Sequence, residues 1–491
     1  MRRYFFSVTL AVLLAFTLLA CGGSSSTSPV SSPGPSAPGN AAVPVSVTIH
    51  DTPPAGVTIL KFEILVTAAT LQPSDMSQQP VNMLPQPQDV ELIHLQTESA
   101  LLANLNVPEG TYNSLSATFA NPLMTIWNQS MQTYTVGAQS CMPMQVCEVV
   151  PTLNQMSVSF SAAPFPITLT ANSPVVLDMD FNVNASVQGD LSVTPTVTVN
   201  QLPAPPSTPV EHLRLIGMVT GVMSPTFTLQ SSYDGSMSTI TTDSNTKYHF
   251  GPSCQMDNFN CIAIGQLLSV RVDVMSDGTL EAKEVRLIQM PGLPTFLGTV
   301  LSVNAAQNQF QFGLCFAQGP ATFNPQFQNA ASAISVTVQL SSSTMFSIDS
   351  DDLTLPAGLT FASVSDLVVG QTVAFQPMLP LTISGTPPNI MVTVGAASLE
   401  LEPSQITATI SAVNASASPA NFILSPLPMF YTNAGITQLQ VDAVTGTNFQ
   451  NFSGIGSLST GQTVSVSGLV FNTATQPTVV ADDIRLHQGN D

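Results

Sequence analysis

The stretch Ile216-Gly217-Met218-Val219-Thr220-Gly221-Val222, with Phe227-Thr228-Leu229 shortly after it, decides the fold of the second half of the chain. Two short apolar and β-branched runs separated by a turn predict a β-hairpin. The same pattern returns at residues 297–303 with 310–312, and at residues 407–413 with 422–424. A pattern that recurs in this way predicts three tandem copies of one structural module.

Two later landmarks occur in the same order in every copy. A Gly-Gln pair precedes a strand-like run at Gly265, Gly370 and Gly461. A closing run ends each copy, at residues 280–287, 394–401 and 479–486. Modules of this length, with short strands and turns such as Asp277-Gly278, predict small β-barrels. The second copy carries an insertion, residues 313–333, which is either a binding loop or surface decoration, and its composition favours decoration.

Alternation of apolar and polar residues marks the strands of the first half. Three runs place their apolar side chains on one face: Val43 to Ile49, Leu60 to Thr67 and Val175 to Val183. In the last run Asp178 and Asp180 occupy the opposite face, which is interpreted as the wet side of a sheet. A short helix is predicted around Glu98 to Leu105. The simplest architecture for residues 43–201 is an antiparallel β-sandwich, so the fold class predicted for the chain is all-β.

The N-terminal segment has the features of an export signal, because Arg2 and Arg3 precede an apolar run that ends at Leu18-Leu19-Ala20-Cys21. This ending resembles the lipobox of bacterial lipoproteins, in which the signal is cut before the cysteine and the thiol is diacylated. The resemblance implies that Cys21 is lipidated, and two or three acyl chains suffice for stable anchoring. The resemblance also favours the outer membrane, because in proteobacterial lipoproteins an Asp after the cysteine retains the protein at the inner membrane, and here Gly22 follows Cys21. The alternative is a transmembrane anchor or a secretory signal with a chance cysteine.

Charged residues are scarce, since they make up 8% of the 491 residues against a typical value of about 25%. The net charge of -20 opposes a polyanionic partner, and the clustered Lys and Arg that nucleic-acid binding needs are absent. Residues 22–40 are almost wholly Gly, Ser, Thr, Pro and Ala. Such a segment cannot bury enough apolar area to order itself, so it is predicted to be a disordered tether.

Five cysteines remain after Cys21. They include two closely spaced pairs, Cys141 with Cys147 and Cys254 with Cys261. Each pair is predicted to close a local loop as a disulfide in an oxidising compartment, which leaves Cys315 unpaired. The alternative for the second pair is a zinc site that includes His249, but this set lacks a fourth ligand.

The sequence contains no metalloprotease helix motif, P-loop, dinucleotide fingerprint or nucleophile elbow, and its five histidines are scattered. No enzymatic activity and no cofactor are therefore predicted. Asp349, Asp351 and Asp352 are a candidate calcium group, although a solvated turn is the favoured interpretation. Trp127, the sole tryptophan, is one candidate platform for a sugar ring, and a place in a core or at its rim is favoured over that role.

The motifs resemble two known families. The strand Val45 to Ile49, the turn Asp51-Thr52-Pro53 and the turn Glu109-Gly110-Thr111-Tyr112 resemble domain-of-unknown-function family 4382, a domain of bacterial lipoproteins. The three landmarks of the repeats resemble domain-of-unknown-function family 5666, which recurs in tandem in bacterial envelope proteins. That resemblance implies small β-barrels of the oligonucleotide/oligosaccharide-binding type (OB-like barrels). Neither resemblance implies a known activity.

The predicted domains are a signal peptide (1–20), a tether (21–42), the sandwich (43–201), a Pro-rich linker (202–210) and barrels at 211–291, 292–403 and 404–489. We expect a non-catalytic, lipid-anchored lipoprotein of the bacterial outer membrane, facing the periplasm or the cell surface, with a binding or structural role. The first alternative is a carbohydrate-binding or adhesive surface protein, and the second is an enzyme with a dispersed site. The expected partners are the membrane, through the lipid anchor, and a polysaccharide or an envelope protein.

Overall fold

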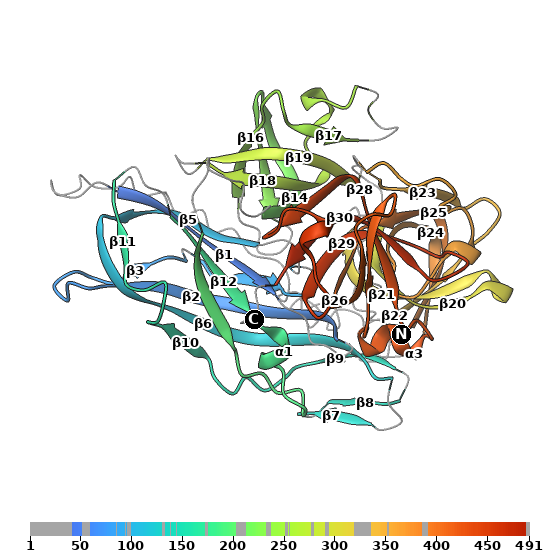
Figure 1. The fold of residues 1–491 in the computed structure, drawn as a ribbon, viewed down its shortest axis with the longest axis horizontal. Coiled ribbons are helices and arrows are strands. Elements are labelled where there is room, and N and C mark those ends of the chain that lie inside the picture. The colour runs from blue at the N-terminus through green and yellow to red at the C-terminus, as the bar shows by residue number, and fades with distance from the viewer. Residues whose placement is uncertain are drawn as a thin grey trace, which may run out of the picture. The chain divides into compact units, whose positions relative to one another are not determined.

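The computed structural model describes residues 42–51, 59–84, 86–93, 95, 100–129, 133–137, 139–143, 145–171, 175–202, 213–231, 237–250, 254, 256–275, 279–289, 294–318, 335–350, 353–384 and 391–487. Strands dominate this part of the chain, and the all-β prediction is confirmed. Within the same residues, no helix combines the length and the apolar character that crossing a membrane requires. Figure 1 shows the order of the strands along the chain, from blue to red.

The first domain is a β-sandwich of two sheets. One sheet has the order β13 (Val197–Leu202), β12 (Val175–Phe181), β1 (Ala42–Asp51) and β5 (Ala100–Pro108). The other is built on β2 (Ile59–Pro73) and β6 (Gly110–Trp127), with β3 (Val81–Asn82), β4 (Gln88–Glu91), β9 (Val146–Val149), β10 (Ser157–Phe160) and β11 (Ile167–Leu169) beside them. The two sheets share one apolar core, in which Phe62 packs edge-on against Phe181 at 5.9 Å between ring centroids.

Three details of the sandwich differ from the predictions. The strands β1 and β12 run parallel, so one sheet is mixed rather than wholly antiparallel. The helix predicted around Glu98 to Leu105 is wrong, because Ala100–Pro108 is strand β5. The helix propensity of its Leu and Ala residues is overridden by backbone pairing with β1 and by the burial of Leu102 and Val107.

The third difference concerns Asp178 and Asp180, which were interpreted as the wet side of a sheet. Both are buried, with exposed fractions of 1% and 4%. Strand β12 is an inner strand, and nearly all of its residues are buried whichever way they point. Both faces of this sheet are therefore covered along β12, which strict alternation alone does not indicate.

The second half of the chain forms three barrels of one topology. Barrel 1 comprises β14 (Leu213–Met223), β15 (Thr226–Ser231), β16 (Met237–Thr241), β17 (Lys247–His249), β18 (Leu267–Val274) and β19 (Leu280–Gln289). Barrel 2 comprises β20 (Thr295–Asn304), β21 (Gln309–Gln318), β22 (Ser335–Gln339), β23 (Met345–Ile348), β24 (Thr372–Ser384) and β25 (Met391–Glu402). Barrel 3 comprises β26 (Ser404–Asn414), β27 (Ala420–Leu424), β28 (Leu439–Gln450), β29 (Thr463–Phe471) and β30 (Thr478–Leu486).

Barrel 3 closes in the order β26-β27-β28-β30-β29, which is strands 1-2-3-5-4 of the copy. Its third strand, β28, runs parallel to its fifth, β30. Barrels 1 and 2 repeat this order with the third strand split in two, and the parallel pairs β16–β19 and β22–β25 close the ring. A five-stranded closed barrel of this kind is the architecture expected of OB-like domains, so the barrel prediction is confirmed. Gly313 to Gln318 of the predicted insertion continue strand β21, and residues 319–334 lie outside the described residues.

The Gly-Gln landmark has the same structural role in every copy. Each glycine has a positive φ, +86° at Gly265, +94° at Gly370 and +89° at Gly461. The glutamine that follows accepts a hydrogen bond from the backbone N–H three residues earlier, at 2.7 Å for Ala263, 2.7 Å for Val368 and 2.6 Å for Ser459. The landmark is therefore a turn device that starts the fourth strand, because a left-handed backbone favours glycine.

A second repeated device was not predicted. One threonine in each copy donates its hydroxyl to the carbonyl of an alanine on the fifth strand: Thr246 to Ala282, Thr344 to Ala396 and Thr447 to Ala481, at 2.7–2.8 Å. Each hydroxyl also accepts a hydrogen bond from the backbone N–H three residues earlier. The bond attaches the third strand to the fifth at the point where the pairing of these two strands is interrupted. The sequence carried its signal, since Thr is followed by Lys-Tyr, Met-Phe and Asn-Phe in the three copies.

Candidate functional site at the junction of the three barrels

Strands β29 and β30 of barrel 3 are buried on both faces. Val464, Val466 and Ile484 point into the barrel's own core. The residues on the outer face change character along the strands: Leu469, Phe471 and Val480 belong to the core cluster of barrel 2. Toward the other end the outer face is polar, with Ser465, Ser467, Asp483 and Arg485, and yet it is buried too. This polar half leads to a group of ion pairs that joins the three barrels. We call this group the junction; its ion pairs are formed by Arg271, Glu284 and Arg286 of barrel 1, Asp349 and Glu402 of barrel 2, and Asp482 and Asp483 of barrel 3.

A β-bulge in the fifth strand directs carboxylates into the junction. In barrel 3, Ser467 pairs with Asp483 and Gly468 pairs with Ala481, so Asp482 is the extra residue. Because a bulge sets two consecutive residues against one on the partner strand, both Asp482 and Asp483 are presented to the junction. The same register shift recurs in barrel 1, where Arg271 pairs with Glu284 and Val272 pairs with Ala282.

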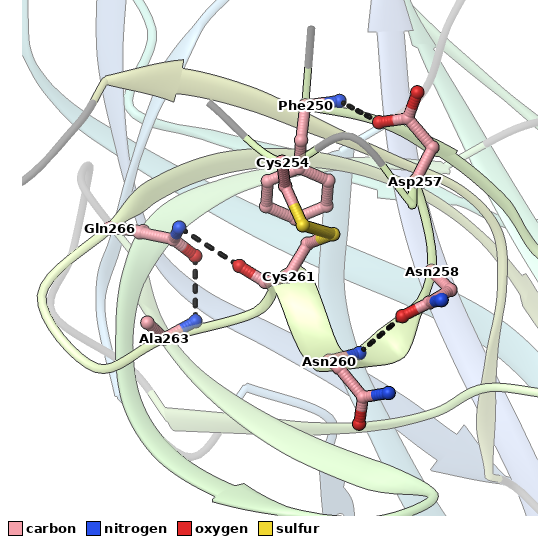
Figure 2. Close-up of a disulfide and its surroundings, with 8 residues drawn as sticks. All are labelled: Phe250, Cys254, Asp257, Asn258, Asn260, Cys261, Ala263 and Gln266. Carbon is pink, nitrogen blue, oxygen red and sulfur yellow. Dashed lines mark hydrogen bonds between the residues drawn. A yellow bond between two sulfur atoms is a disulfide. The ribbon is translucent and has the colours of Figure 1, made fainter. Parts of the chain in front are cut away.

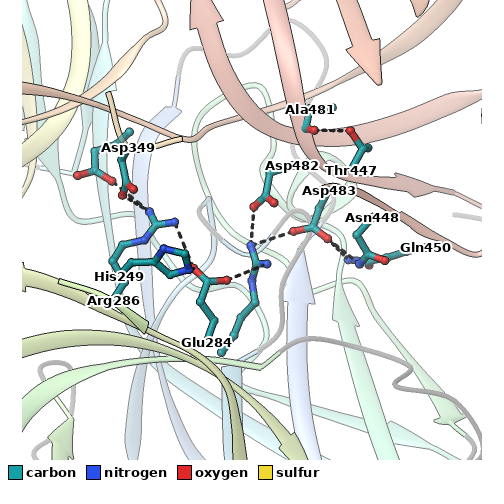
Figure 3. Close-up of polar contacts among 12 residues, drawn as sticks. His249, Glu284, Arg286, Asp349, Thr447, Asn448, Gln450, Ala481, Asp482 and Asp483 are labelled. Atoms are coloured by element: carbon teal, nitrogen blue, oxygen red, sulfur yellow. Dashed lines mark hydrogen bonds and ion pairs between the residues drawn. The ribbon is translucent and has the colours of Figure 1, made fainter. Parts of the chain in front are cut away.

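Arg271 on β18 joins barrel 1 to barrel 3. Its Nη2 lies 2.5 Å from Asp482 Oδ2 and 3.1 Å from Asp483 Oδ2, and its Nη1 lies 3.3 Å from Glu284 Oε2. Asp483 is fully buried, and its other oxygen accepts a 2.7 Å hydrogen bond from Asn448. Figure 3 shows Asp482, Asp483 and Glu284 turned toward one guanidinium. Such charge-assisted bonds are stronger than neutral ones, and a guanidinium can hold several carboxylates at once.

Arg286 on β19 extends the junction to barrel 2. Its guanidinium forms ion pairs with Asp349, with Glu402 at 3.6 Å and with Glu284 at 3.3 Å. Glu284 thus lies between two arginines, and His249 Nε2 is 3.9 Å from it. Burial lowers the pKa of Arg286, but the carboxylates of Asp349, Glu284 and Glu402 outweigh it and raise that pKa above its usual value. The arginine is therefore held charged inside the junction.

Carboxylates outnumber arginines at the junction. Burial raises the pKa of Asp482; Arg271 opposes this rise, whereas Asp483 and Glu284 add to it. Burial also raises the pKa of Glu400 on β25, and the nearby Asp349 raises it further against the effect of Arg286. A buried excess of negative charge is costly, so the site favours protonation of its least well paired carboxyl groups.

Both predicted disulfides are present. Cys141 is bonded to Cys147 and Cys254 to Cys261. Figure 2 shows the second bridge beside Phe250, in a loop where Gln266 donates a hydrogen bond to the Cys261 carbonyl at 3.0 Å. The zinc alternative does not fit this structure, because the sulfurs of Cys254 and Cys261 are bonded to each other rather than present as thiolates. Cys315 is a free cysteine, half-buried on β21.

The remaining predicted residues have separate places. Asp349 pairs with Arg286, while Asp351 and Asp352 lie outside the described residues, so the calcium group stays a prediction. Cys21 also lies outside them. Trp127 packs edge-on against Phe430 of barrel 3 at 5.7 Å between ring centroids. It therefore joins the sandwich to a barrel, which is the rim role favoured from the sequence.

One Ser–His pair exists at the edge of the junction. Ser465 Oγ lies 2.8 Å from His487 Nε2 and is also hydrogen-bonded to Thr407. A nucleophile needs access to its substrate, and Ser465 has an exposed fraction of 0%. The geometry suits a buried structural hydrogen-bond chain between β26, β29 and the end of β30.

Sequence reasoning missed the two arginines of the junction. A signal for them existed: only nine residues of the chain are Lys or Arg, and five of these lie between residues 211 and 291, namely Arg214, Lys247, Arg271, Lys283 and Arg286. Residues 292–403 contain no Lys or Arg and six Asp or Glu. Opposite charge on neighbouring modules is a signal of contact between them, but it does not say which residues meet.

In the comparison with known proteins, family models match parts of two of the four domains. Residues 42–195 match the family model described as a domain of unknown function, DUF4382. Residues 216–286, within barrel 1, match a second domain of unknown function, DUF5666. These are the two families that the motifs resemble. The DUF4382 match begins with β1 at Ala42 and ends before β13 (Val197–Leu202), so it spans all but the last strand of the sandwich.

The other comparisons add little. No curated protein matches the chain. Among solved structures, a similar chain is described as drosophila Unr CSD456; it is 9% identical, and the match covers 56% of this chain and 98% of that chain with a TM-score of 0.13. No conclusion about fold or function follows from a likeness of that size.

Proposed function

We propose that the protein is a non-catalytic lipoprotein of the bacterial cell envelope, attached to the outer membrane through Cys21, with a binding or structural role. The observation that supports a non-catalytic role is the use of its ionisable residues. In the described residues, the ion pairs of Arg271 and Arg286 join barrels to one another, and the hydroxyl of Ser465 is buried and inaccessible to a substrate. An array of four β-domains on a tether is suited to holding a binding or structural surface away from a membrane.

Replacing Cys21 with Ser is expected to move the protein from the membrane fraction to the soluble fraction, because the thiol is the proposed site of acylation. Fractionation of cells that express the variant, with the mass of the N-terminal peptide, measures this. Cys315→Ser is the matched control, since it removes another unpaired thiol, and its protein should stay in the membrane fraction. Membrane retention of Cys21→Ser with an unacylated N-terminus would refute the anchor.

A second candidate function is carbohydrate binding by barrel 1. Its second and third strands carry a neutral array of hydroxyl groups, in which Thr228 pairs with Thr239 and Thr226 pairs with Thr241. Thr239 is exposed and Thr228 is half-buried. The face of the second and third strands is where OB-fold barrels bind oligosaccharides, and uncharged hydroxyl groups suit a neutral glycan. Trp127 is not the platform for this function, because it packs on Phe430.

The test is binding of the mature chain to an array of neutral polysaccharides. If barrel 1 binds glycans, the double variant Thr228→Val with Thr239→Val loses the signal, since valine keeps the strand shape and removes both hydroxyls. Thr111→Val with Thr168→Val is the control: these exposed threonines face each other in the sandwich, and their loss should leave binding unchanged. A blank array, or equal binding by both double variants, would remove this candidate.

A further inference from the structure

The junction holds more carboxyl groups than its cations can neutralise. The charged and titratable residues that face it are Arg271, His249, Glu284 and Arg286 from barrel 1, Asp349, Glu400 and Glu402 from barrel 2, and Asp482, Asp483 and Arg485 from barrel 3. Six carboxyl groups thus share three arginines and a histidine. The imbalance is sharpest where Glu284, Asp482 and Asp483 all contact Arg271.

The two aspartates of barrel 3 are not equivalent. Asp483 accepts from Asn448 and is within 3.4 Å of Gln450 Nε2, so its charge is stabilised by neutral donors of its own barrel. Asp482 forms its ion pair with Arg271, which belongs to another barrel. Asp482 therefore carries a charge whose stabilisation depends on the contact between barrels, beside a second buried carboxylate.

We propose that docking of barrel 3 on barrel 1 takes up a proton at Asp482, so that mild acid tightens the junction and a rise in pH loosens it. The proton comes from solvent and is held by a carboxyl oxygen of Asp482. Protonation of Asp482 removes its repulsion with the neighbouring carboxylates of Asp483 and Glu284.

The sign of the pH dependence follows from linkage. Burial, together with Asp483 and Glu284, raises the pKa of Asp482 above its ordinary value in the docked state, despite Arg271. The docked state then binds more protons than the undocked one, and its stability falls as the pH rises. The contribution is fully present below the ordinary aspartate pKa and is lost as the pH passes through the raised one. A contact linked to one proton changes by up to about tenfold in its equilibrium constant per pH unit in that window.

Hydrogen exchange of the complete mature chain at about pH 5 and about pH 8, corrected for the intrinsic exchange rate, tests the proposal. Protection of β19 and β30 should fall at the higher pH, relative to strands β2 and β6 of the sandwich. In Asp482→Asn, which imitates the protonated form, the change in protection with pH should be markedly smaller than in the unchanged chain. Asp442→Asn is the matched control, because Asp442 is a buried carboxyl of barrel 3 whose pKa is raised by burial, but it accepts a hydrogen bond from Gln440 of its own barrel.

Asp442→Asn should therefore keep the pH-dependent loss of protection at β19 and β30. The proposal is overturned if Asp482→Asn shows the same pH dependence as the unchanged chain, or if protection at the junction rises with pH. Should Asp482→Asn not fold, the unchanged chain still decides: equal changes at β30 and at β2 between the two pH values would contradict a proton-linked junction.

Discussion

Arg271→Met is expected to destabilise the docked barrels by about 3–5 kcal/mol, because it leaves buried carboxylates without their shared partner. Asp483 has an exposed fraction of 0% and Asp482 of 8%, so water cannot solvate their charges in place of the lost ion pairs. Denaturant unfolding followed by hydrogen exchange at β18 and β30 measures the effect. Loss of protection should appear first at these two strands, because β18 carries Arg271 and β30 carries its partners Asp482 and Asp483.

Two further variants control this experiment. Arg271→Lys keeps the charge but not the planar fork, and it should lose only part of the stability. Lys247→Met removes an exposed cation from the same barrel and should change stability by less than about 1 kcal/mol. If Arg271→Met behaved like Lys247→Met, the junction would not hold the barrels together.

Phe471→Ala is expected to cost about 3–5 kcal/mol, which is the usual range for removing a fully buried phenylalanine. Phe471 is 1% exposed and, although it belongs to barrel 3, it packs in the core cluster of barrel 2 with Phe375 and Leu401. The lost side chain therefore leaves a cavity between two barrels. Thermal unfolding should show barrel 2 melting earlier, together with barrel 3.

Phe62→Ala is the control for this prediction, since Phe62 is equally buried but lies in the sandwich core. It should accelerate hydrogen exchange in β2 and β6 and leave β24 and β25 unchanged, whereas Phe471→Ala should do the reverse. Faster exchange confined to barrel 3 in Phe471→Ala would contradict the shared core.

The repeat, the turns that begin the fourth strands and the two disulfides could be predicted from the sequence. The Gly-Gln pairs at Gly265, Gly370 and Gly461 were recognisable because a left-handed turn needs the same residue type in each copy. Short cysteine spacing likewise predicted both disulfides, because loop closure over so few residues is a local property. Each of these features depends on residues that are close in the chain.

Features that depend on contacts between distant parts of the chain could not be predicted from the sequence. Asp178 and Asp180 were assigned to a wet face, since alternation reports the pattern of one strand and not what covers its second face. The helix around Glu98 to Leu105 was wrong for a similar reason, because pairing with β1 decides the conformation of β5. The junction itself joins Arg271 to Asp482, which are 211 residues apart, and no local spacing reveals such a pair.

A double-mutant cycle between Arg271→Met and Asp483→Asn tests most directly whether the barrels are held by the junction. The two residues belong to different barrels and lie 3.1 Å apart between Nη2 and Oδ2. Their separate effects on the free energy of unfolding should therefore fail to add, with a coupling energy of about 0.5–3 kcal/mol, as found for residues in direct contact. Additive effects, with a coupling energy near zero, would contradict the account of three barrels joined through buried ion pairs.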